Sequence, residues 1–238
     1  MSEEDRRTVE AEREPNFLLA RPEKRTLRAI ARRLPRWVLP DDLTAIGVLS
    51  AIGICAAYVL SNQSSAWLWV ASGLLVVHWL GDSLDGTLAR VREIQRPRYG
   101  YYLDHFVDAV STALIGIGLG LSPYMLLSVG TLIVVAYLIL SINVYLEAHA
   151  LGRFSIGYGL IGPTEIRVIL IALNTALALT PGTVHFTVAH TRFTPLDVVG
   201  IAIAAVMVVL LLVRAVRNLR ELAALEPAAS RRGPSTKL

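Results

Sequence analysis

Apolar residues along the chain come in long runs that are separated by short polar segments. We identify six such runs, at residues 43–60, 66–88, 101–121, 124–146, 163–181 and 195–213. A bilayer core of about 30 Å requires about 20 apolar residues per helix, so each run predicts one membrane-spanning helix. The fifth run carries Asn174 and is long enough only if Pro163 and Thr164 form its first turn, where proline is tolerated.

The segment before the first run has a different pattern. Four apolar residues recur there at helical spacing while arginines occupy the positions between them: Leu27, Ile30, Ala31 and Leu34 alternate with Arg25, Arg28, Arg32 and Arg33. This predicts a basic amphipathic helix over residues 23–36 that lies on the membrane surface and is attracted by anionic lipid heads. The alternative is a positively charged stop to the first span without a separate role.

The two ends of the chain are polar and show no hydrophobic period. We therefore predict a disordered N-terminal tail at residues 1–22 and a C-terminal tail at residues 221–238, with a single six-helix domain over residues 37–220 between them. The expected fold class is an all-α membrane protein with six transmembrane helices.

Composition supports a multi-pass membrane protein. Of the 238 residues 54% are hydrophobic, and the mean hydropathy is +0.53. Basic residues cluster at residues 25–36, 92–98 and 214–220, which lie on one side if six spans are correct. The positive-inside rule then places both termini and these loops in the cytoplasm, and the cell (inner) membrane is the expected location. The net charge of +4 follows from these flanks and does not indicate nucleic-acid binding.

Four aspartates lie where the second predicted span ends and the third begins. Asp82 and Asp85 are three residues apart and Asp104 and Asp108 four, so each pair shares one face of its helix. An aspartate at membrane depth costs roughly 2.5 to 3.5 kcal/mol, and bound cations would offset that cost. Carboxylates favour hard ions, so two divalent ions, Mg²⁺ or Mn²⁺, are predicted. A salt-bridge network with nearby arginines is the alternative, but it leaves excess negative charge.

The neighbouring residues suit a bound phosphate. Gly86 and Ala89 are small and lie on the aspartate-bearing face, where a nucleotide can approach the backbone. Arg90 offers a bidentate donor to phosphate. Gly100 precedes the third predicted span, where free N–H groups favour an anion.

Together these residues form the pattern D-x2-D-G-x2-A-R-x9-G-x3-D-x3-D over residues 82–108, which resembles the CDP-alcohol phosphotransferase family. The resemblance implies that Asp82, Asp85 and Asp104 bind metal and that Asp108 binds metal and acts as general base. It also implies a CDP site lined by Asp85, Gly86, Ala89, Arg90 and Gly100. The implied reaction is attack by an acceptor hydroxyl on a CDP-alcohol, with release of CMP.

The resemblance leaves the substrates open. We expect CDP-diacylglycerol as donor and a role in phospholipid biosynthesis; the alternative is a choline- or ethanolamine-type enzyme in which diacylglycerol is the acceptor. Arg153, Glu165 and Arg167 are the candidate acceptor-binding residues. The alternative outside enzymes is a divalent-cation transporter, which would require acids midway through several spans.

Two further features carry weaker predictions. Gly116 and Gly120 form a G-x3-G pattern that brings helices together, and dimers occur in the family, so a homodimer is possible. His105 follows Asp104 but should point about 100° away from it, so we expect it to pack or to bond at an interface.

Overall fold

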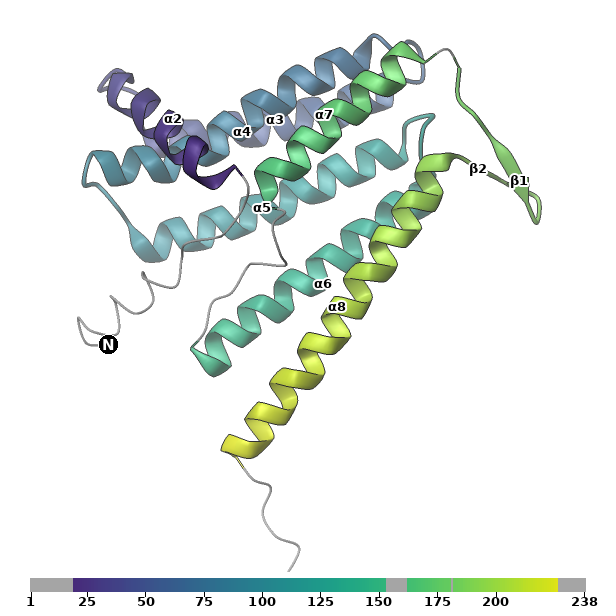
Figure 1. The fold of residues 1–238 in the computed structure, drawn as a ribbon. Coiled ribbons are helices and arrows are strands. Elements are labelled where there is room, and N and C mark those ends of the chain that lie inside the picture. Colours follow the sequence, from purple (N-terminus) through teal and green to yellow (C-terminus); the bar gives the residue numbers. More distant parts are fainter. Residues whose placement is uncertain (1–18, 153–161, 181, 227–238) are drawn as a thin grey trace, which may run out of the picture.

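The computed structural model describes residues 19–152, 162–180 and 182–226. Seven helices lie in this part of the chain: α2 (Ala20–Arg33), α3 (Pro40–Leu60), α4 (Trp67–Val91), α5 (Pro97–Gly120), α6 (Leu127–Leu151), α7 (Pro163–Leu179) and α8 (Pro195–Leu225). A short antiparallel hairpin, β1 (Phe186–Val188) and β2 (Thr191–Phe193), joins α7 to α8 and pairs Phe186 with Phe193. Figure 1 shows α3, α4, α5 and α7 grouped together, and α6 running beside α8.

Five of these helices are long and apolar enough to cross a membrane, namely α3, α4, α5, α6 and α8. The chain is therefore an integral membrane protein of the all-α class. Helix α7 occupies the fifth predicted run but has only 17 residues, so the sixth span stays a prediction, as does the cytoplasmic location of both termini. Each predicted run coincides with a helix because a helix satisfies its backbone hydrogen bonds within one segment, as an apolar bilayer interior requires.

Several helices begin or end away from the edges of their apolar runs. Helix α5 begins at Pro97, which occupies its first turn, rather than at residue 101. Helix α8 continues through a polar segment to Leu225, because residues such as Arg, Leu, Glu and Ala favour helix outside the membrane as well. Residues 1–18 and 227–238 of the predicted tails, and Arg153, lie outside the described residues.

Helix α2 lies across α4, at the end of the bundle that contains the aspartates (Figure 1). Its apolar side packs into a buried cluster with α3 and α4, made of Leu27, Ala31, Leu43, Leu84 and Leu88. Its arginines are exposed on the other side. Helix α2 therefore has two faces. Its apolar face packs against the protein, and its face of arginines is exposed, where lipid heads can reach it.

Helices α3 and α4 approach most closely next to the first aspartate. A Cβ atom on Gly81 would lie 2.7 Å from the carbonyl oxygen of Leu43 and 2.8 Å from the backbone nitrogen of Gly47. Only glycine fits there without moving backbone. This contact fixes the depth and rotation at which α4 presents Asp82, the next residue.

The G-x3-G pattern in α5 forms its contact within the chain. A Cβ atom on Gly120 would lie 2.9 Å from the Cα atom of Leu127, and one on Gly130 would lie 2.6 Å from the carbonyl oxygen of Gly116. Gly116 and Gly120 therefore bring α5 against α6. The homodimer has no support from this pattern and stays a prediction.

Helix α7 is attached to the bundle through Asn174, which is fully buried. The Tyr58 hydroxyl donates to its side-chain oxygen at 3.1 Å, and its amide nitrogen donates to Ser72 Oγ at 3.3 Å. Asn174, the polar residue within the fifth apolar run, therefore connects α7 to α3 and α4. In an apolar environment such a bond offsets the cost of burying the amide.

Candidate metal and phosphate site

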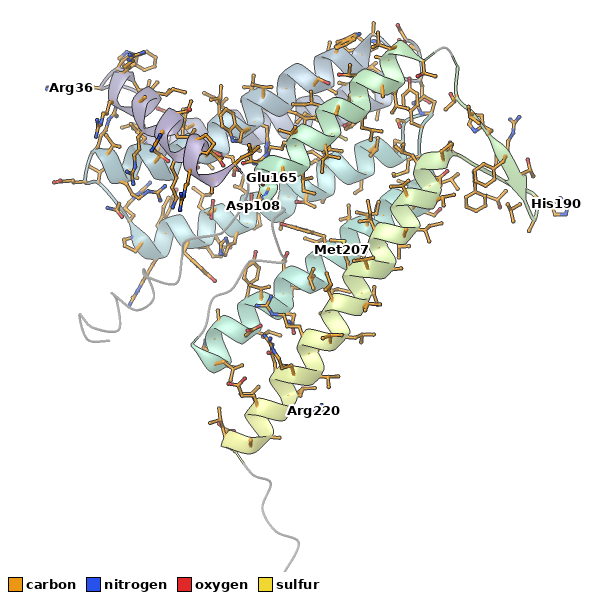
Figure 2. All side chains as sticks on the ribbon, viewed as in Figure 1. Arg36, Asp108, Glu165, His190, Met207 and Arg220 are labelled. Atoms are coloured by element: carbon orange, nitrogen blue, oxygen red, sulfur yellow. The ribbon has the colours of Figure 1, made fainter. Side chains whose placement is uncertain are left out.

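The four predicted aspartates lie on two helices that both pack against α3. Helix α4 carries Asp82 and Asp85 near its end, and α5 carries Asp104 and Asp108 near its beginning. Asp104 is exposed, and the other three are partly buried. Figure 2 labels Asp108 on α5 and Glu165 at the beginning of α7.

Three side chains of α5 form a group whose geometry suits a metal ion. One ligand atom from each of Asp104, His105 and Asp108 lies within 4.8 Å of the others. Two carboxylates and one imidazole form an acceptable donor set for Mn²⁺, and the carboxylates alone suit Mg²⁺. The residues present therefore fit a divalent ion at this place.

The aspartates of α4 are turned toward other partners. Arg167 of α7 donates to Asp82 Oδ2 at 2.5 Å, and the Thr44 hydroxyl of α3 donates to Asp85 Oδ2 at 2.6 Å. The backbone N–H of Gly86 donates to Asp85 Oδ1. Asp82 and Asp85 consequently stand outside the three-residue group of α5, although their charges act on it.

Electrostatic interactions connect the two aspartate pairs. The charge of Asp108 interacts with those of Asp82, Asp85, Asp104 and Arg167. Like charges at this depth repel one another strongly because the surrounding dielectric constant is low. Helices α4, α5 and α7 thus bring four carboxylates and one guanidinium into a single electrostatic unit, which is the environment expected to attract cations.

Three of the residues predicted to line a CDP site, Gly86, Ala89 and Arg90, lie next to one another on α4. The Arg90 guanidinium lies over Gly86, because a Cβ atom on Gly86 would be 3.4 Å from Arg90 Nη1. Arg90 also donates to Thr87 Oγ1 at 3.3 Å, and Ala89 is partly buried beside it. Gly86, Ala89 and Arg90 therefore lie on one stretch of α4, where Arg90 can turn toward a phosphate.

Gly100 differs from its predicted setting. Because α5 begins at Pro97, Gly100 lies inside the first turn, and its N–H donates to the carbonyl oxygen of Arg96 at 2.7 Å rather than being available to an anion. A Cβ atom at Gly100 would meet no atom within 4 Å, so the backbone faces open space. A role in lining a nucleotide site stays a prediction.

Two of the three candidate acceptor residues lie within the described part of the chain. Arg167 pairs with Asp82 and is largely buried, with 11% of its side chain exposed. Glu165 is buried and accepts hydrogen bonds from the backbone N–H groups of Leu19 and Gly162, both at 2.9 Å. Arg167 therefore adjoins the aspartates directly, whereas Glu165 connects α7 to the beginning of α2.

The alternative salt-bridge network would have used Arg90 and Arg92, and Arg92 has other partners. Arg92 donates to the carbonyl oxygens of Leu34, Pro35 and Val38 and so ties the end of α4 to the segment between α2 and α3. On the exposed rim, Arg96 donates to Asp41, and this hydrogen bond raises the pKa of the Arg96 guanidinium.

Sequence reasoning missed three partners of the aspartates. The His105 ring packs on Tyr145 of α6, as predicted, but its Nδ1 atom lies 3.4 Å from Asp104 Oδ2, whereas the sequence predicted that the ring points away from Asp104. The adjacent acid and histidine were the only available signal. The partners Thr44 and Arg167 are separated from Asp85 and Asp82 by 41 and 85 residues, respectively, and no local pattern marks them.

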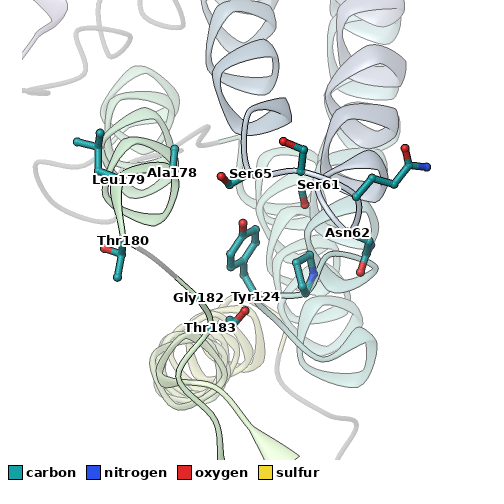
Figure 3. Close-up of a pocket in the computed structure, with 12 residues that line it drawn as sticks. Ser61, Asn62, Ser65, Tyr124, Ala178, Leu179, Thr180, Gly182 and Thr183 are labelled. Atoms are coloured by element: carbon teal, nitrogen blue, oxygen red, sulfur yellow. The ribbon is translucent and has the colours of Figure 1, made fainter.

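Two cavities lie at different places in the fold. One of about 230 Å³ adjoins Asp82 and is lined by Ala20, Glu23, Lys24, Asp82, Ser83, Pro163, Thr164 and Glu165. The other, of about 480 Å³, lies where α3 ends and α4 and α6 begin; it is lined mainly by small polar residues such as Ser61, Ser65 and Thr180 (Figure 3). Only the first cavity touches a predicted site residue.

Comparisons with known proteins give a family match and a curated relative. A family model described as CDP-alcohol phosphatidyltransferase matches residues 37–216. Among curated proteins, the chain is similar to cholinephosphotransferase 1 of Danio rerio, with 24% identity over 165 residues, which cover 63% of this chain and 41% of that protein. The chain thus spans less than half the length of this relative. Residues 37–216, which the family model matches, contain all four aspartates.

Proposed function

The chain belongs to the CDP-alcohol phosphatidyltransferase family, and on that premise we propose that it is a transferase that moves a phosphatidyl group from CDP-diacylglycerol to an acceptor hydroxyl. CMP is the second product. The observation that supports the proposal is that Asp104 and Asp108 of α5 form a group suited to a metal ion and that the charges of Asp82, Asp85 and Arg167 act on Asp108. A divalent-cation carrier would not explain the family match.

Asp108 is the proposed general base. It is partly buried and lies among the other aspartates. It would accept the proton of the acceptor hydroxyl while that oxygen forms a bond to the phosphorus next to the diacylglycerol. The bond from this phosphorus to the CMP oxygen breaks, and CMP leaves with the electron pair.

Asp82, Asp85, Asp104 and Asp108 are the proposed ligands of two divalent ions, Mg²⁺ or Mn²⁺. Bound ions would supply charge stabilisation on the pyrophosphate during displacement. The chain itself contributes Arg90, which lies over Gly86 and can bind the departing nucleotide phosphate. Asp85, Ala89 and Gly100 complete the proposed nucleotide site.

The acceptor is proposed to bind near Arg167, together with Glu165 and Arg153. Arg167 is held at the beginning of α7 and reaches the aspartates, so a negatively charged head group bound there would have its hydroxyl close to Asp108. The positive-inside pattern supports a cytoplasmic active site in the cell membrane.

A choline- or ethanolamine-type reaction is the second candidate, because the curated relative is a cholinephosphotransferase and because Asp104 contacts His105. In that reaction the small alcohol is carried by CDP and diacylglycerol accepts. The two candidates differ only in which substrate is the lipid.

One experiment separates these possibilities. Protein purified into lipid nanodiscs is incubated with Mg²⁺ or Mn²⁺ and either CDP-diacylglycerol plus inositol phosphate, glycerol phosphate or serine, or CDP-choline or CDP-ethanolamine plus diacylglycerol. Metal-dependent CMP release, with the new lipid identified by mass spectrometry, is the expected result. Omission of the acceptor and addition of EDTA are the controls. Absence of CMP release with every donor would contradict the proposal.

A further inference from the structure

One carboxylate outside the aspartate cluster connects three helices. Glu23 lies in the first turn of α2, and its Oε1 atom accepts a hydrogen bond from the indole Nε1 of Trp79 at 2.8 Å and from the Thr164 hydroxyl at 2.8 Å. The Ser83 hydroxyl contacts the same oxygen at 3.4 Å. Trp79 and Ser83 belong to α4, and Thr164 belongs to α7.

A reciprocal bond strengthens this connection. Glu165 of α7 accepts the backbone N–H of Leu19, the residue just before α2, at 2.9 Å. Glu23 of α2 thus accepts a hydrogen bond from α7, and Glu165 of α7 accepts one from the residue at the beginning of α2. We call the contacts of Glu23 and Glu165 with Leu19, Trp79, Ser83 and Thr164 the α2 clasp.

The α2 clasp adjoins the proposed site directly. Ser83 follows Asp82, and Thr164 lies three residues before Arg167, so the contacts of Glu23 hold both helices within one turn of the Asp82–Arg167 pair. Glu23, Glu165 and Asp82 also line the same cavity of about 230 Å³. A shift of either helix would change where Asp82 and Arg167 lie.

We propose that Glu23 is a positioning residue, which holds α4 and α7 in the register that brings Asp82 to Arg167. This inference rests on the proposed function for its catalytic consequence. A displacement of about 1 Å at a reacting group can cost about a hundredfold in rate, so a loosened clasp should lower turnover although Glu23 touches no substrate. The basic surface of α2 would anchor the clasp at the membrane interface.

The first test measures position without activity. Spin labels are attached to cysteines introduced at Val77 of α4 and Ile169 of α7, both exposed, with Cys55 replaced by alanine. Glu23→Ala should shift or broaden the distance distribution between the two labels, and Glu23→Gln, which keeps an acceptor oxygen, should restore it. An unchanged distribution in Glu23→Ala would overturn the proposal.

The second test measures the consequence at the site. Glu23→Ala should lower kcat for CMP release at least about tenfold and weaken binding of Mn²⁺ measured without substrate, while Glu23→Gln recovers most of both. Glu226→Ala, at an exposed carboxylate where α8 ends, is the matched control and should behave as wild type. Equal losses in the alanine and glutamine variants would overturn a hydrogen-bonding role.

A third variant guards against misfolding of Glu23→Ala. Thr164→Val removes one donor of the clasp and keeps the side-chain shape, and it should lower kcat and Mn²⁺ binding in the same direction by a smaller factor. Wild-type values in Thr164→Val and in Trp79→Phe would overturn the proposal. A wild-type protein that releases no CMP would contradict the proposed function, and the spin-label distances would still decide the clasp.

Discussion

Among the acidic side chains of the described membrane helices, those of two regions are compensated differently. Between α6 and α8, Glu147 is buried, and it accepts hydrogen bonds from Arg214 and from Asn218, the latter at 3.0 Å. Arg217 adds a second positive charge 4.0 Å away. Between α4 and α5, four aspartates act on one another through their charges, Arg167 pairs with one of them, Asp82, and 51% of the Asp104 side chain is exposed.

This difference separates a structural use of charge from a chemical one. A carboxylate with nearby arginines and an amide is satisfied inside the protein and joins two helices that are otherwise apolar. A group of carboxylates with more negative charge than the nearby arginine can neutralise attracts cations. Such cations can enter only if solvent or substrate reaches the site. We therefore propose that Glu147 serves helix pairing and that the aspartates serve catalysis, and the following variants test that proposal.

The largest effect is expected for Asp108→Asn. The substitution keeps the size of the side chain and removes the proposed base and metal ligand, so CMP release should fall at least about a thousandfold. The apparent melting temperature should not fall, because the other aspartates repel Asp108 in the metal-free protein. Turnover assays and thermal melting of the same preparation measure both quantities.

The matched control is Asp41→Asn, which breaks only an exposed ion pair with Arg96. Such pairs contribute little, so this variant should keep its activity. Undiminished turnover in Asp108→Asn would contradict the role of Asp108 as general base. The proposed difference between the aspartates and Glu147 would then have no support from this variant.

Much of this arrangement follows from the sequence, and the remainder depends on distant contacts. The apolar runs predict the helices because lipid and helix packing both require apolar surface. The spacing of Asp82 with Asp85, and of Asp104 with Asp108, predicts two acidic faces. The pairing of Asp82 with Arg167 was not predictable, because it depends on how α7 packs on α4 through contacts such as that of Asn174 with Ser72. Whether the aspartates bind metal stays a prediction.

A second variant, Glu147→Gln, should affect stability rather than chemistry. It leaves Arg214 buried without its carboxylate partner, and removing one member of a buried pair costs about 3 kcal/mol. The melting temperature should therefore fall, while kcat measured well below it should stay near wild type. Replacing both residues, as Glu147→Leu with Arg214→Met, should recover much of the loss. Lost turnover at an unchanged melting temperature would place Glu147 in the site.

A smaller effect is expected where α3 supports the acidic place. Gly81→Ala would bring a Cβ atom to 2.7 Å from the carbonyl oxygen of Leu43, so the backbones must separate, at a cost of about 2 kcal/mol. Because Asp82 is the next residue, turnover should fall together with stability. Gly73→Ala, on the same helix with no atom within 4 Å of the new Cβ, is the control and should lose neither. Equal effects in both variants would show that the close contact does not position Asp82.

The smallest effect is expected for Arg167→Lys, which keeps the positive charge beside Asp82 but loses the planar, bidentate donor. If Arg167 binds the acceptor, the KM for a negatively charged acceptor should rise about tenfold, which corresponds to about 1.4 kcal/mol, while the KM for the CDP-alcohol changes little. Initial-rate measurements with each substrate varied in turn separate the two constants. If instead only the Mg²⁺ concentration needed for half-maximal rate increases, Arg167 acts through Asp82 and does not bind the acceptor. Its role would then be to pair with a carboxylate, as Arg214 pairs with Glu147.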